Sequence, residues 1–498
     1  MTISVPKLQS STTPIPTTHA AKVALFASLF RGREDVYPRF WTNERKGTKG
    51  WAPACSNEWK RPLCQKPKVK CGECSHQAFG SVTPQVIQDH LQGHHVIGVY
   101  PLMRSERCHL LAIDFDEGSW ADDVAAFAET CRAVGLPAAV ERSRSGNGAH
   151  AWFFFDEAIP AAVARRVGCY LLTETMSRRP ELSMDSYDRL FPNQDTMPRG
   201  GFGNLIALPL QRAAREHGNT VFVDDALRPH ADQWAFLAGV PRIPAATAEL
   251  VAREAQRQGR VLGVRFAAVD EDDAPWARSP SGRLPRTALR DPLPEAVRIV
   301  RGQRLFIEKA GLPGGFVTEL RRLAAFQNPE FYKKQAMHLS TRGTPRVVTC
   351  AEESGPFLSL PRGCEGDAVA LVTECGTKPA MDDQRASGEP VQVEFRGELT
   401  EVQARAAAAV LPHDIGMVVA PPGTGKTVLG AALVAKTRPQ YVGPRAPEAS
   451  PRPVGRTAFG VPRHPAEGDR RHRRRQAQGH GPDRRRHDPE PRSEGTGR

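Results

Sequence analysis

Two aspartates separated by one residue, Asp114 and Asp116, stand at the end of the apolar run Cys108-His-Leu-Leu-Ala-Ile. The run predicts a buried strand, and because side chains alternate along a strand, both carboxylates should lie on one face at its end. Neighbouring carboxylates repel each other unless a cation neutralises them, and such oxygen ligands suit Mg²⁺ or Mn²⁺. The pair therefore indicates a divalent-metal site, although strands also end in acidic residues that only face solvent.

A polar glycine loop follows between two further apolar runs, in Val140-Glu-Arg-Ser-Arg-Ser-Gly-Asn-Gly-Ala-His-Ala-Trp-Phe-Phe-Phe. We expect a strand, a loop and a second strand that opens at His150. Glycines let main-chain N–H groups approach a phosphate, and arginines neutralise its charge. A histidine at the start of a strand also occurs for structural reasons alone. The candidate nucleotide-binding residues of the loop are Arg142, Arg144, Ser145, Gly146 and Gly148.

Four of the ten cysteines lie within 20 residues, in a segment rich in Lys, Pro and Trp. The CxxC pair that ends this cluster supplies two ligands from one turn, and zinc bound by four thiolates has no open coordination position. We predict a structural zinc site, with disulfides or unpaired buried thiols as the alternatives. The predicted ligands are Cys55, Cys64, Cys71 and Cys74. Five basic residues of the segment can contact nucleic acid or only form a solvated rim: Lys60, Arg61, Lys66, Lys68 and Lys70.

A second phosphate-binding motif, Ala-Pro-Pro-Gly-Thr-Gly-Lys-Thr, occupies residues 420–427. We expect a strand over Ile415–Ala420 before it and a helix over Thr427–Lys436 after it, which is the setting of a P-loop. In such a loop the main-chain amides cradle phosphates, the lysine reaches the β and γ groups, and the threonine binds Mg²⁺. The predicted ATP-binding residues are Gly423, Thr424, Gly425, Lys426 and Thr427.

In this order, D-x-D, S-G-x-G-x-H and a later Asp resemble the catalytic motifs of the archaeo-eukaryotic primase superfamily. Longer segments resemble the primase-like domain of TOTE conflict systems, bacterial and phage proteins in which that domain is joined to a superfamily 2 helicase. The resemblance covers roughly residues 20–435. Besides the cysteine cluster and residues 141–150, it rests on Leu29-Phe-Arg-Gly-Arg-Glu-Asp-Val-Tyr-Pro, Ser186-Tyr-Asp-Arg-Leu-Phe-Pro-Asn-Gln-Asp and Gly203-Asn-Leu-Ile-Ala-Leu-Pro-Leu.

The resemblance implies a template-directed nucleotidyltransferase, a primase or primase-polymerase that acts on DNA. Asp114 and Asp116 would hold two divalent ions, with Asp188 as the third carboxylate and Asp185 as the second choice for that position. His150 and the loop serine would contact the phosphates of the incoming nucleotide. One metal would activate a 3′-hydroxyl and the other would stabilise the departing pyrophosphate. The implied partners are nucleotides, single-stranded or template DNA, and an RNA primer.

The P-loop region carries its own resemblance, to superfamily 2 helicases. Gln403 is similar to the adenine-reading glutamine that precedes their P-loop, and Phe306–Phe331 is similar to the region before the motor. No DEAD or DEAH box follows, and residues 438–498, with 15 arginines and no lysine, have no apolar strand to carry an acidic group for Mg²⁺. We interpret this tail as an out-of-frame product that truncates the helicase, because a one-base shift can encode the expected apolar strand and helix. A native basic tail that binds nucleic acid is the alternative.

The elements that must position these residues are those of an α+β protein. From Ala20 to about Phe266, β-rich runs alternate with helical patterns, which predicts an α/β or α+β domain. The resemblance implies that this domain is a primase-like, RRM-related catalytic domain, with a zinc-binding insertion at 55–74. We also expect a helix over Ala20–Phe30, a strand over Asn204–Leu210, helical structure over Val317–Gln327 and short strands around Arg346–Cys350. The predicted order is a disordered N-terminus (1–19), the catalytic domain (20–268), a linker (269–293), a small mixed connector domain (294–395), the truncated start of a RecA-like domain (396–437) and a disordered basic tail (438–498).

Composition excludes an integral membrane protein and favours a nucleic-acid partner. The 498 residues are 40% hydrophobic and 25% charged, and no apolar run approaches the ~20 residues of a membrane span. We therefore expect a cytoplasmic protein without a membrane partner. The net charge is +13, but residues 438–498 supply +8 of it and the rest of the chain only +5. The nucleic-acid prediction therefore depends on the motifs. Two other classes stay open beside the enzyme: a non-catalytic nucleic-acid-binding adaptor, and the remnant of an ATP-binding DNA helicase.

Overall fold

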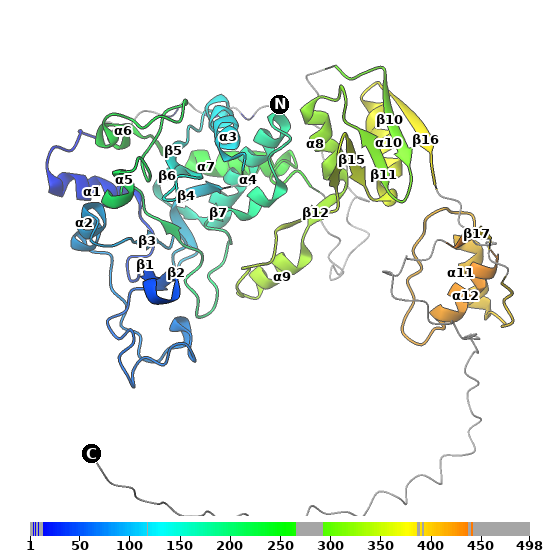
Figure 1. Cartoon of the computed structure of the whole chain (residues 1–498), viewed down its shortest axis with the longest axis horizontal. Coiled ribbons are helices and arrows are strands. Elements are labelled where there is room, and N and C mark those ends of the chain that lie inside the picture. The colour runs from blue at the N-terminus through cyan, green and yellow to red at the C-terminus, as the bar shows by residue number, and fades with distance from the viewer. Residues whose placement is uncertain are drawn as a thin grey trace, which may run out of the picture. The chain divides into compact units, whose positions relative to one another are not determined.

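The computed structural model describes residues 3, 5, 8, 13–116, 118–264, 292–385, 389–390, 393–436 and 440–441. The chain divides into two units, Met1–Ala386 and Ser387–Arg498 (Figure 1). Almost all of the predicted linker (269–293) and of the predicted basic tail (438–498) lies outside the described residues. Of the first twelve residues the structure describes three, Ile3, Val5 and Leu8, and these pack against the main apolar core.

A five-stranded sheet forms the centre of the first unit, with the order β5-β6-β4-β7 and with β9 parallel to β6. The strand predicted before the two aspartates is β4 (Arg107–Phe115), which is buried along most of its length. The strands predicted on either side of the glycine loop are β5 (Ala139–Arg142) and β6 (Ala149–Pro160). The other two are short, β7 (Leu190–Phe191) and β9 (Arg242–Ile243). The sheet therefore carries both candidate catalytic segments.

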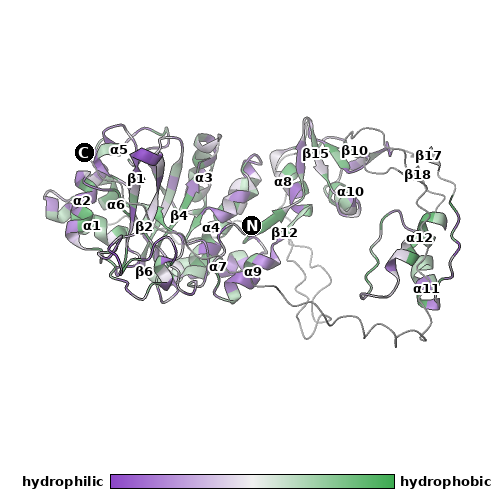
Figure 2. Cartoon of the chain, turned by 60° about the horizontal axis from the view of Figure 1, so that its bottom comes forward, coloured by the Kyte–Doolittle hydropathy of each residue, from purple (hydrophilic) through white to green (hydrophobic). Residues whose placement is uncertain are grey.

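The aromatic run of β6 holds helices on both faces of this sheet. On one face Trp152 and Phe154 meet the edge of Phe30, which follows α1 (His19–Leu29), at centroid distances of 5.1 and 5.2 Å. On the other face Phe153 lies 6.2 Å from Phe127 of α3 (Trp120–Val134). Each such buried side chain contributes about 2 kcal/mol. The helix α4 (Ala161–Arg178) packs against α3, and α7 (Ala245–Arg257) packs against α4. In Figure 2 α3 carries both hydrophobic and hydrophilic residues, as expected of a helix with one face on a core.

A hairpin of β1 (Pro38–Asn43) and β2 (Thr48–Pro53) precedes the cysteine segment, and α2 (Pro84–Gln92) follows it. Next, β3 (Gly98–Val99) pairs with β8 (Ile206–Ala207). The strand predicted over Asn204–Leu210 is thus shortened to two residues. Pro209 has no N–H to donate to a ladder, and Leu210 has a φ of 61°, which no strand residue adopts.

A second sheet within the same unit has its own apolar core and the order β14-β15-β11-β10-β16. The helices α8 (Gly314–Leu323) and α10 (Glu365–Glu374) contribute to that core. The strands are β10 (Ala296–Arg301), β11 (Leu305–Glu308), β14 (Glu352–Ser354), β15 (Phe357–Leu360) and β16 (Lys378–Asp383).

The prediction of helix over Val317–Gln327 is wrong in its last part, because α8 ends at Leu323. Ala325–Gln327 is β12, which pairs antiparallel with β13 (Val347–Thr349). In the sequence, α9 (Pro329–Ala336) connects the two strands. Ala325 of β12 and Val347 of β13 belong to the apolar core of the first sheet. Pairing with a distant strand has therefore overridden the local helical pattern.

The second unit contains the two predicted helices, α11 (Glu401–Val410) and α12 (Lys426–Lys436), and a pair of two-residue strands, β17 (Glu389–Pro390) and β18 (Gln440–Tyr441). The strand predicted over Ile415–Ala420 is absent. A strand needs a neighbour for its main-chain groups, and within the described part of this unit only β17 and β18 pair. Met417 and Val419 are accordingly 85% and 87% exposed.

The remaining elements are short. They are α5 (Arg212–Arg215), α6 (Gln233–Gly239) and 3₁₀ turns at Glu44–Lys46, Cys71–Glu73, Met184–Asp188 and Arg362–Cys364. No helix in the described ranges is both long enough and apolar enough to cross a membrane. The described chain is thus a mixed α/β structure.

Candidate active site

Three charged side chains lie in a row across the central sheet. The strand register pairs Asp114 of β4 with His150 of β6, and His150 with Glu141 of β5. Residues directly opposite each other on neighbouring strands point to the same face. His150 Nδ1 donates to Glu141 Oε2 at 2.7 Å, and His150 Nε2 lies 3.5 Å from Asp114 Oδ1. The structure thus brings a predicted metal ligand and a predicted phosphate ligand together.

Glu141 is the buried end of this row, with its side chain 1% exposed. The same Oε2 also accepts from Trp152 Nε1 at 3.0 Å. Because an ionised carboxylate only accepts, the bond to Glu141 requires a proton on Nδ1 of His150. Burial lowers the pKa of His150, but the Glu141 and Asp114 carboxylates outweigh burial and leave that pKa above its ordinary value. The environment therefore favours an imidazolium, which attracts phosphate.

Asp116 follows the end of β4 and lines a small pocket together with Asp114. In this structure Asp116 forms an ion pair with Arg189. Two carboxylates that face one pocket suit a divalent cation. Among the residues described, however, no three His, Cys, Asp or Glu side chains are grouped as the ligands of one metal ion. The rest of the pocket is lined by Phe115, Trp120, Asp123, Leu182, Ser186 and Arg189.

Gly148 packs the glycine loop against the end of β4. A Cβ at this position would lie 2.7 Å from Phe115 O and 3.3 Å from Asp116 Cα, so the close approach requires glycine. Gly146 has a φ of 79°, in the left-handed region. Ser145 Oγ accepts from the N–H of Asn147 at 3.3 Å, within the turn itself. The two glycines therefore give the loop its shape and place it beside Asp116.

Both arginines of the loop contact the surrounding fold. Arg142 Nη2 donates to Leu227 O at 2.8 Å. The guanidinium of Arg144 lies 4.1 Å from the ring centroid of Phe40 on β1, and burial lowers the pKa of Arg144. Arg144 thus joins the glycine loop to the β1–β2 hairpin.

Asp188 ends the 3₁₀ turn Met184–Asp188 and does not line the pocket of Asp114 and Asp116. Both of its carboxylate oxygens accept the main-chain N–H of Arg346, at 2.8 and 3.1 Å. Burial raises the pKa of Asp188, and the charge and N–H of Arg346 offset this only in part. The second choice, Asp185, is an exposed residue of the same turn. The structure therefore leaves the third carboxylate apart from the first two.

The four predicted zinc ligands line one small cavity together with His76. All four are free thiols, so none forms a disulfide. Main-chain N–H groups of Lys66 and Trp59 lower the pKa of the Cys64 thiol, which favours the thiolate form that zinc binds. The donor set thus fits zinc, although these side chains are not grouped at ligand positions.

In the second unit the predicted P-loop has the backbone of a tight glycine turn. Gly423 and Gly425 have φ values of 84° and 77°. Lys426 Nζ folds back onto the loop and donates to Ala420 O and Pro421 O, at 2.8 Å each. Thr427 is the second residue of α12. The ammonium group of Lys426 is therefore hydrogen-bonded to carbonyl oxygens of the loop itself.

Gln403 connects the first turn of α11 with this loop. Its Nε2 donates to Thr424 O at 2.9 Å, while its Oε1 accepts from the N–H of Thr400 at 3.0 Å. Thr400 Oγ1 in turn accepts from the N–H of Gln403, which completes a capping box. The predicted adenine-reading residue thus supports the helix end and the loop.

Sequence reasoning missed Glu141 and Arg189. Both lie inside segments that resemble the primase-like domain. A charged residue within or beside a buried strand was the feature that could have marked each of them as functional. Only the strand register shows that Glu141 stands behind His150, and only the packing of the 3₁₀ turn shows that Arg189 pairs with Asp116.

Residues 21–251 match the family model described as "TOTE conflict system, Archaeo-Eukaryotic Primase domain", a match that spans a little under half of the chain. Among solved structures, the chain is similar to the polymerase domain of ligase D from Mycobacterium tuberculosis in complex with DNA. The sequence identity is 16% and the TM-score 0.24, and the similarity covers 52% of this chain and 96% of that chain. No curated protein matches the chain.

Proposed function

We propose, from the match of residues 21–251 to the archaeo-eukaryotic primase domain of TOTE conflict systems, that this chain is a divalent-metal-dependent, template-directed nucleotidyltransferase. It would act on DNA as a primase or primase-polymerase within a conflict system of a mobile element or phage. The observation that carries the proposal is the row Glu141–His150–Asp114 beside Asp116.

Each residue of the row has a role in this reaction. Asp114 and Asp116, with Asp188 as the third carboxylate, would hold two Mg²⁺ or Mn²⁺ ions, which supply charge stabilisation for the attacking and leaving oxygens. His150, oriented by Glu141, would bind a phosphate of the incoming nucleotide. The main-chain N–H groups of the glycine loop would bind a second phosphate oxygen.

We assign DNA binding to the β1–β2 hairpin and the cysteine segment. Trp41 and Trp59 are exposed there, by 42% and 63%. Lys66 Nζ lies 5.7 Å from the ring centroid of Trp59, and Arg39 lies 3.8 Å from Glu58, which also pairs with Lys66. Exposed aromatic faces beside cationic groups suit the stacking of bases along a single strand. The cysteines would bind a structural Zn²⁺ that rigidifies this segment, which metal analysis of the purified chain tests.

Primer extension with Mn²⁺ or Mg²⁺, a DNA template and labelled NTPs or dNTPs tests the enzymatic proposal. Asp114→Asn should slow extension by more than about a hundredfold, beyond the loss expected for an outer-shell group. Lys426→Ala, in the P-loop of the other unit, is the control and should extend at the wild-type rate. Extension by Asp114→Asn at the wild-type rate, or no extension by the wild type under any of these conditions, would refute the proposal.

The alternative is a nucleic-acid-binding adaptor without catalysis. It is favoured by one observation: Asp188 is bonded to Arg346 outside the pocket, so that three carboxylates are not grouped. An adaptor binds DNA equally well as wild type and as Asp114→Asn, and extends no primer in either form. The same set of proteins therefore decides between the two functions.

We further propose that residues 420–427 bind the phosphates of ATP as the remnant of a superfamily 2 helicase. The positive φ values of Gly423 and Gly425, which give the loop its tight turn, support this. Helicase and ATPase activity would be lost through the truncation at the start of the tail. Resequencing of the locus tests whether a frameshift caused this truncation, because a frameshift predicts that an open reading frame for the rest of the helicase follows downstream.

A further inference from the structure

Arg189 contacts both aspartates of the candidate active site. It directly precedes β7, and the N–H of Asp114 donates to its main-chain oxygen at 3.0 Å. The guanidinium of Arg189 forms the ion pair with Asp116. All three residues line the same pocket. One residue therefore binds the main chain of the first aspartate and the side chain of the second.

Strand register explains why these side chains meet. The pairing of β4 with β7 sets Ile113 opposite Leu190, which brings Arg189 opposite Asp114. Side chains that lie opposite each other on antiparallel strands point to the same face, and alternation returns Asp116 to that face two residues later. The contact between Arg189 and the aspartates thus follows from the pairing of the two strands.

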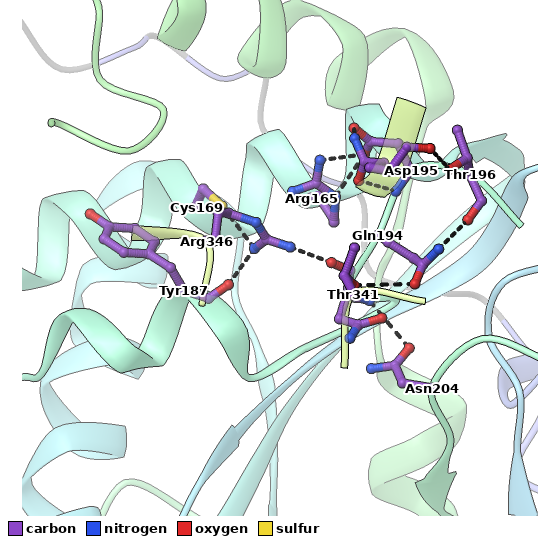
Figure 3. Close-up of polar contacts among 11 residues, drawn as sticks. Arg165, Cys169, Tyr187, Gln194, Asp195, Thr196, Asn204, Thr341 and Arg346 are labelled. Atoms are coloured by element: carbon purple, nitrogen blue, oxygen red, sulfur yellow. Dashed lines mark hydrogen bonds and ion pairs between the residues drawn. The ribbon is translucent and has the colours of Figure 1, made fainter. Parts of the chain in front are cut away.

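The main chain before Arg189 is anchored by the segment Ala325–Thr349, which comprises β12, α9 and β13. Arg346 of this segment is 0% exposed, and its guanidinium donates to the main-chain oxygen of Tyr187 (Figure 3). The N–H of Arg346 donates to both carboxylate oxygens of Asp188, at 2.8 and 3.1 Å. Asp188 therefore helps to fix the loop, whereas its neighbour Arg189 reaches the pocket.

The main chain after Arg189 is anchored by the same segment. The guanidinium of Arg346 also donates to the main-chain oxygen of Asn193. Gln335 of α9 accepts the N–H of Asp195 at 2.9 Å and donates to Asp195 Oδ2 at 2.8 Å. Because the chain is held on both sides of Arg189, a change at this position is confined to the side chain.

The ion pair of Arg189 with Asp116 is open to solvent. The side chain of Asp116 is 53% exposed and that of Arg189 28% exposed. An ion pair exposed to this extent contributes little to stability, because water and salt screen it. A divalent cation carries twice the charge of a guanidinium and binds carboxylate oxygens directly. The guanidinium can therefore be displaced from Asp116 by such a cation at little cost to the fold.

We propose that Arg189 is the resident counter-ion of this site, which neutralises Asp116 until Mg²⁺ or Mn²⁺ binds and is then displaced from it. The inference rests on the proposed function, in which Asp114 and Asp116 bind the metal. The donor set fits a divalent cation, because two carboxylates face one pocket and a positively charged group already lies beside one of them. His150 faces Asp114 in the row, so Arg189 supplies the corresponding charge for Asp116. Competition by Arg189 would set the metal concentration at which the site fills.

Binding of Mn²⁺ alone to the full chain, measured by electron paramagnetic resonance of the free ion, tests the inference. Mn²⁺ prefers oxygen ligands to thiolates, so the cysteine segment takes up little of it. Arg189→Gln removes the competing charge and should tighten Mn²⁺ binding about fivefold, which corresponds to about 1 kcal/mol, the upper value for an exposed ion pair. Arg189→Lys keeps the charge and should bind Mn²⁺ as the wild type does.

Two further variants locate the effect. Arg132→Gln removes the same charge from another exposed ion pair, in which Nη1 of Arg132 on α3 lies 2.5 Å from Asp225 Oδ1. This matched control should leave Mn²⁺ binding unchanged. Asp116→Asn should weaken Mn²⁺ binding, because it removes a carboxylate ligand at the site of competition. Higher salt should narrow the difference between the wild type and Arg189→Gln, since salt screens the ion pair.

Mn²⁺ binding by Arg189→Gln that is no tighter than binding by the wild type would overturn the inference, and weaker binding would mean that Arg189 holds Asp116 in position for the metal. An equal gain in Arg132→Gln or in Arg189→Lys also overturns it, as do unchanged binding in Asp116→Asn and an absence of Mn²⁺ binding in every variant. A chain whose Mn²⁺ binding depends on Arg189 in the expected way but which extends no primer refutes only the proposed function.

Discussion

One carboxylate oxygen of Glu141 accepts two hydrogen bonds. Its Oε2 accepts from His150 Nδ1 at 2.7 Å and from Trp152 Nε1 at 3.0 Å, in a position that is almost fully buried. A buried carboxylate is tolerated only when it is paired and hydrogen-bonded, and His150 supplies the positive partner. Glu141 therefore matters both for folding and for the direction in which the imidazole of His150 faces Asp114.

Glu141→Ala should lower the free energy of unfolding by about 2 kcal/mol, because Trp152 Nε1 and His150 Nδ1 would both lose their acceptor. Glu141→Gln should cost less, since its amide oxygen can still accept one of these bonds. Urea unfolding followed by tryptophan fluorescence measures both values. This account of the row would be contradicted by an alanine variant that is as stable as the wild type, or by one that is more stable than the glutamine variant.

The residue patterns predicted Asp114 and His150 as separate candidates, and their adjacency could not be predicted. A pattern locates a residue along its strand, whereas contact across strands depends on register, which is set by the loops and by the burial of one face. The partner of Asp188 was further out of reach, because Arg346 lies 158 positions away in the sequence. Nothing local to either residue indicates that bond.

At the scale of elements, the sequence patterns predicted β4, β5, β6 and α12 closely, because each has a continuous apolar run or helical spacing of its own. The errors fall where a distant partner decides the structure. Ala325–Gln327 is a strand only because Val347–Thr349 pairs with it. Conversely, Ile415–Ala420 lacks a strand neighbour among the described residues, and its apolar composition alone does not make it a strand.

The turn between β5 and β6 offers a test of how elements position the site. Gly148→Ala places a Cβ 2.7 Å from Phe115 O, so the loop or the end of β4 must move. Overpacking of this kind costs about 1–3 kcal/mol, and the movement should displace Asp116 and lower the extension rate as well as the stability. Primer extension and urea unfolding measure the two effects.

Gly118→Ala is the matched control for this substitution. Gly118 lies two residues after Asp116, and a Cβ there meets nothing within 4 Å. It should therefore leave both stability and extension at wild-type values. If Gly148→Ala behaves like Gly118→Ala, the close packing of the loop on β4 does not position the site.

At the scale of the whole molecule, net charge is a weak indicator of a nucleic-acid partner, and the order of segments along the chain is a weak indicator of which segments pack together. Most of the +13 belongs to residues 438–498, so the basic surface of the remaining chain is modest. A division of the chain by position alone also separates segment 325–349 from the sheet on which it packs. Long-range contacts such as these determine stability, and one buried histidine makes that stability dependent on pH.

His90 of α2 is hydrogen-bonded both to the nearby Ile97 and to Pro209, which is 119 positions away in the sequence. It is 0% exposed, its Nε2 lies 2.9 Å from Pro209 O, and its Nδ1 accepts the N–H of Ile97 at 3.2 Å. Since the carbonyl of Pro209 can only accept, Nε2 carries the proton and the ring is neutral. A second proton on Nδ1 would point at the N–H of Ile97, which is itself a donor, so protonation of His90 would break this hydrogen bond. Burial, with a smaller contribution from the neighbouring His95, lowers the pKa of His90 from an ordinary value near 6.5 to about 4.

Because the pKa is lower in the folded state than in the unfolded state, the unfolded chain binds the proton more readily. The stabilisation from neutral His90 is complete above pH 6.5 and is lost as the pH falls toward 4. The linkage corresponds to about 2 kcal/mol between pH 7 and pH 5. His90→Asn, which does not titrate, should be less stable than the wild type at pH 7, and the gap should narrow by about that amount at pH 5. Urea unfolding of both proteins at the two pH values measures the gap, and a gap that stays constant would show that His90 does not control this acid sensitivity.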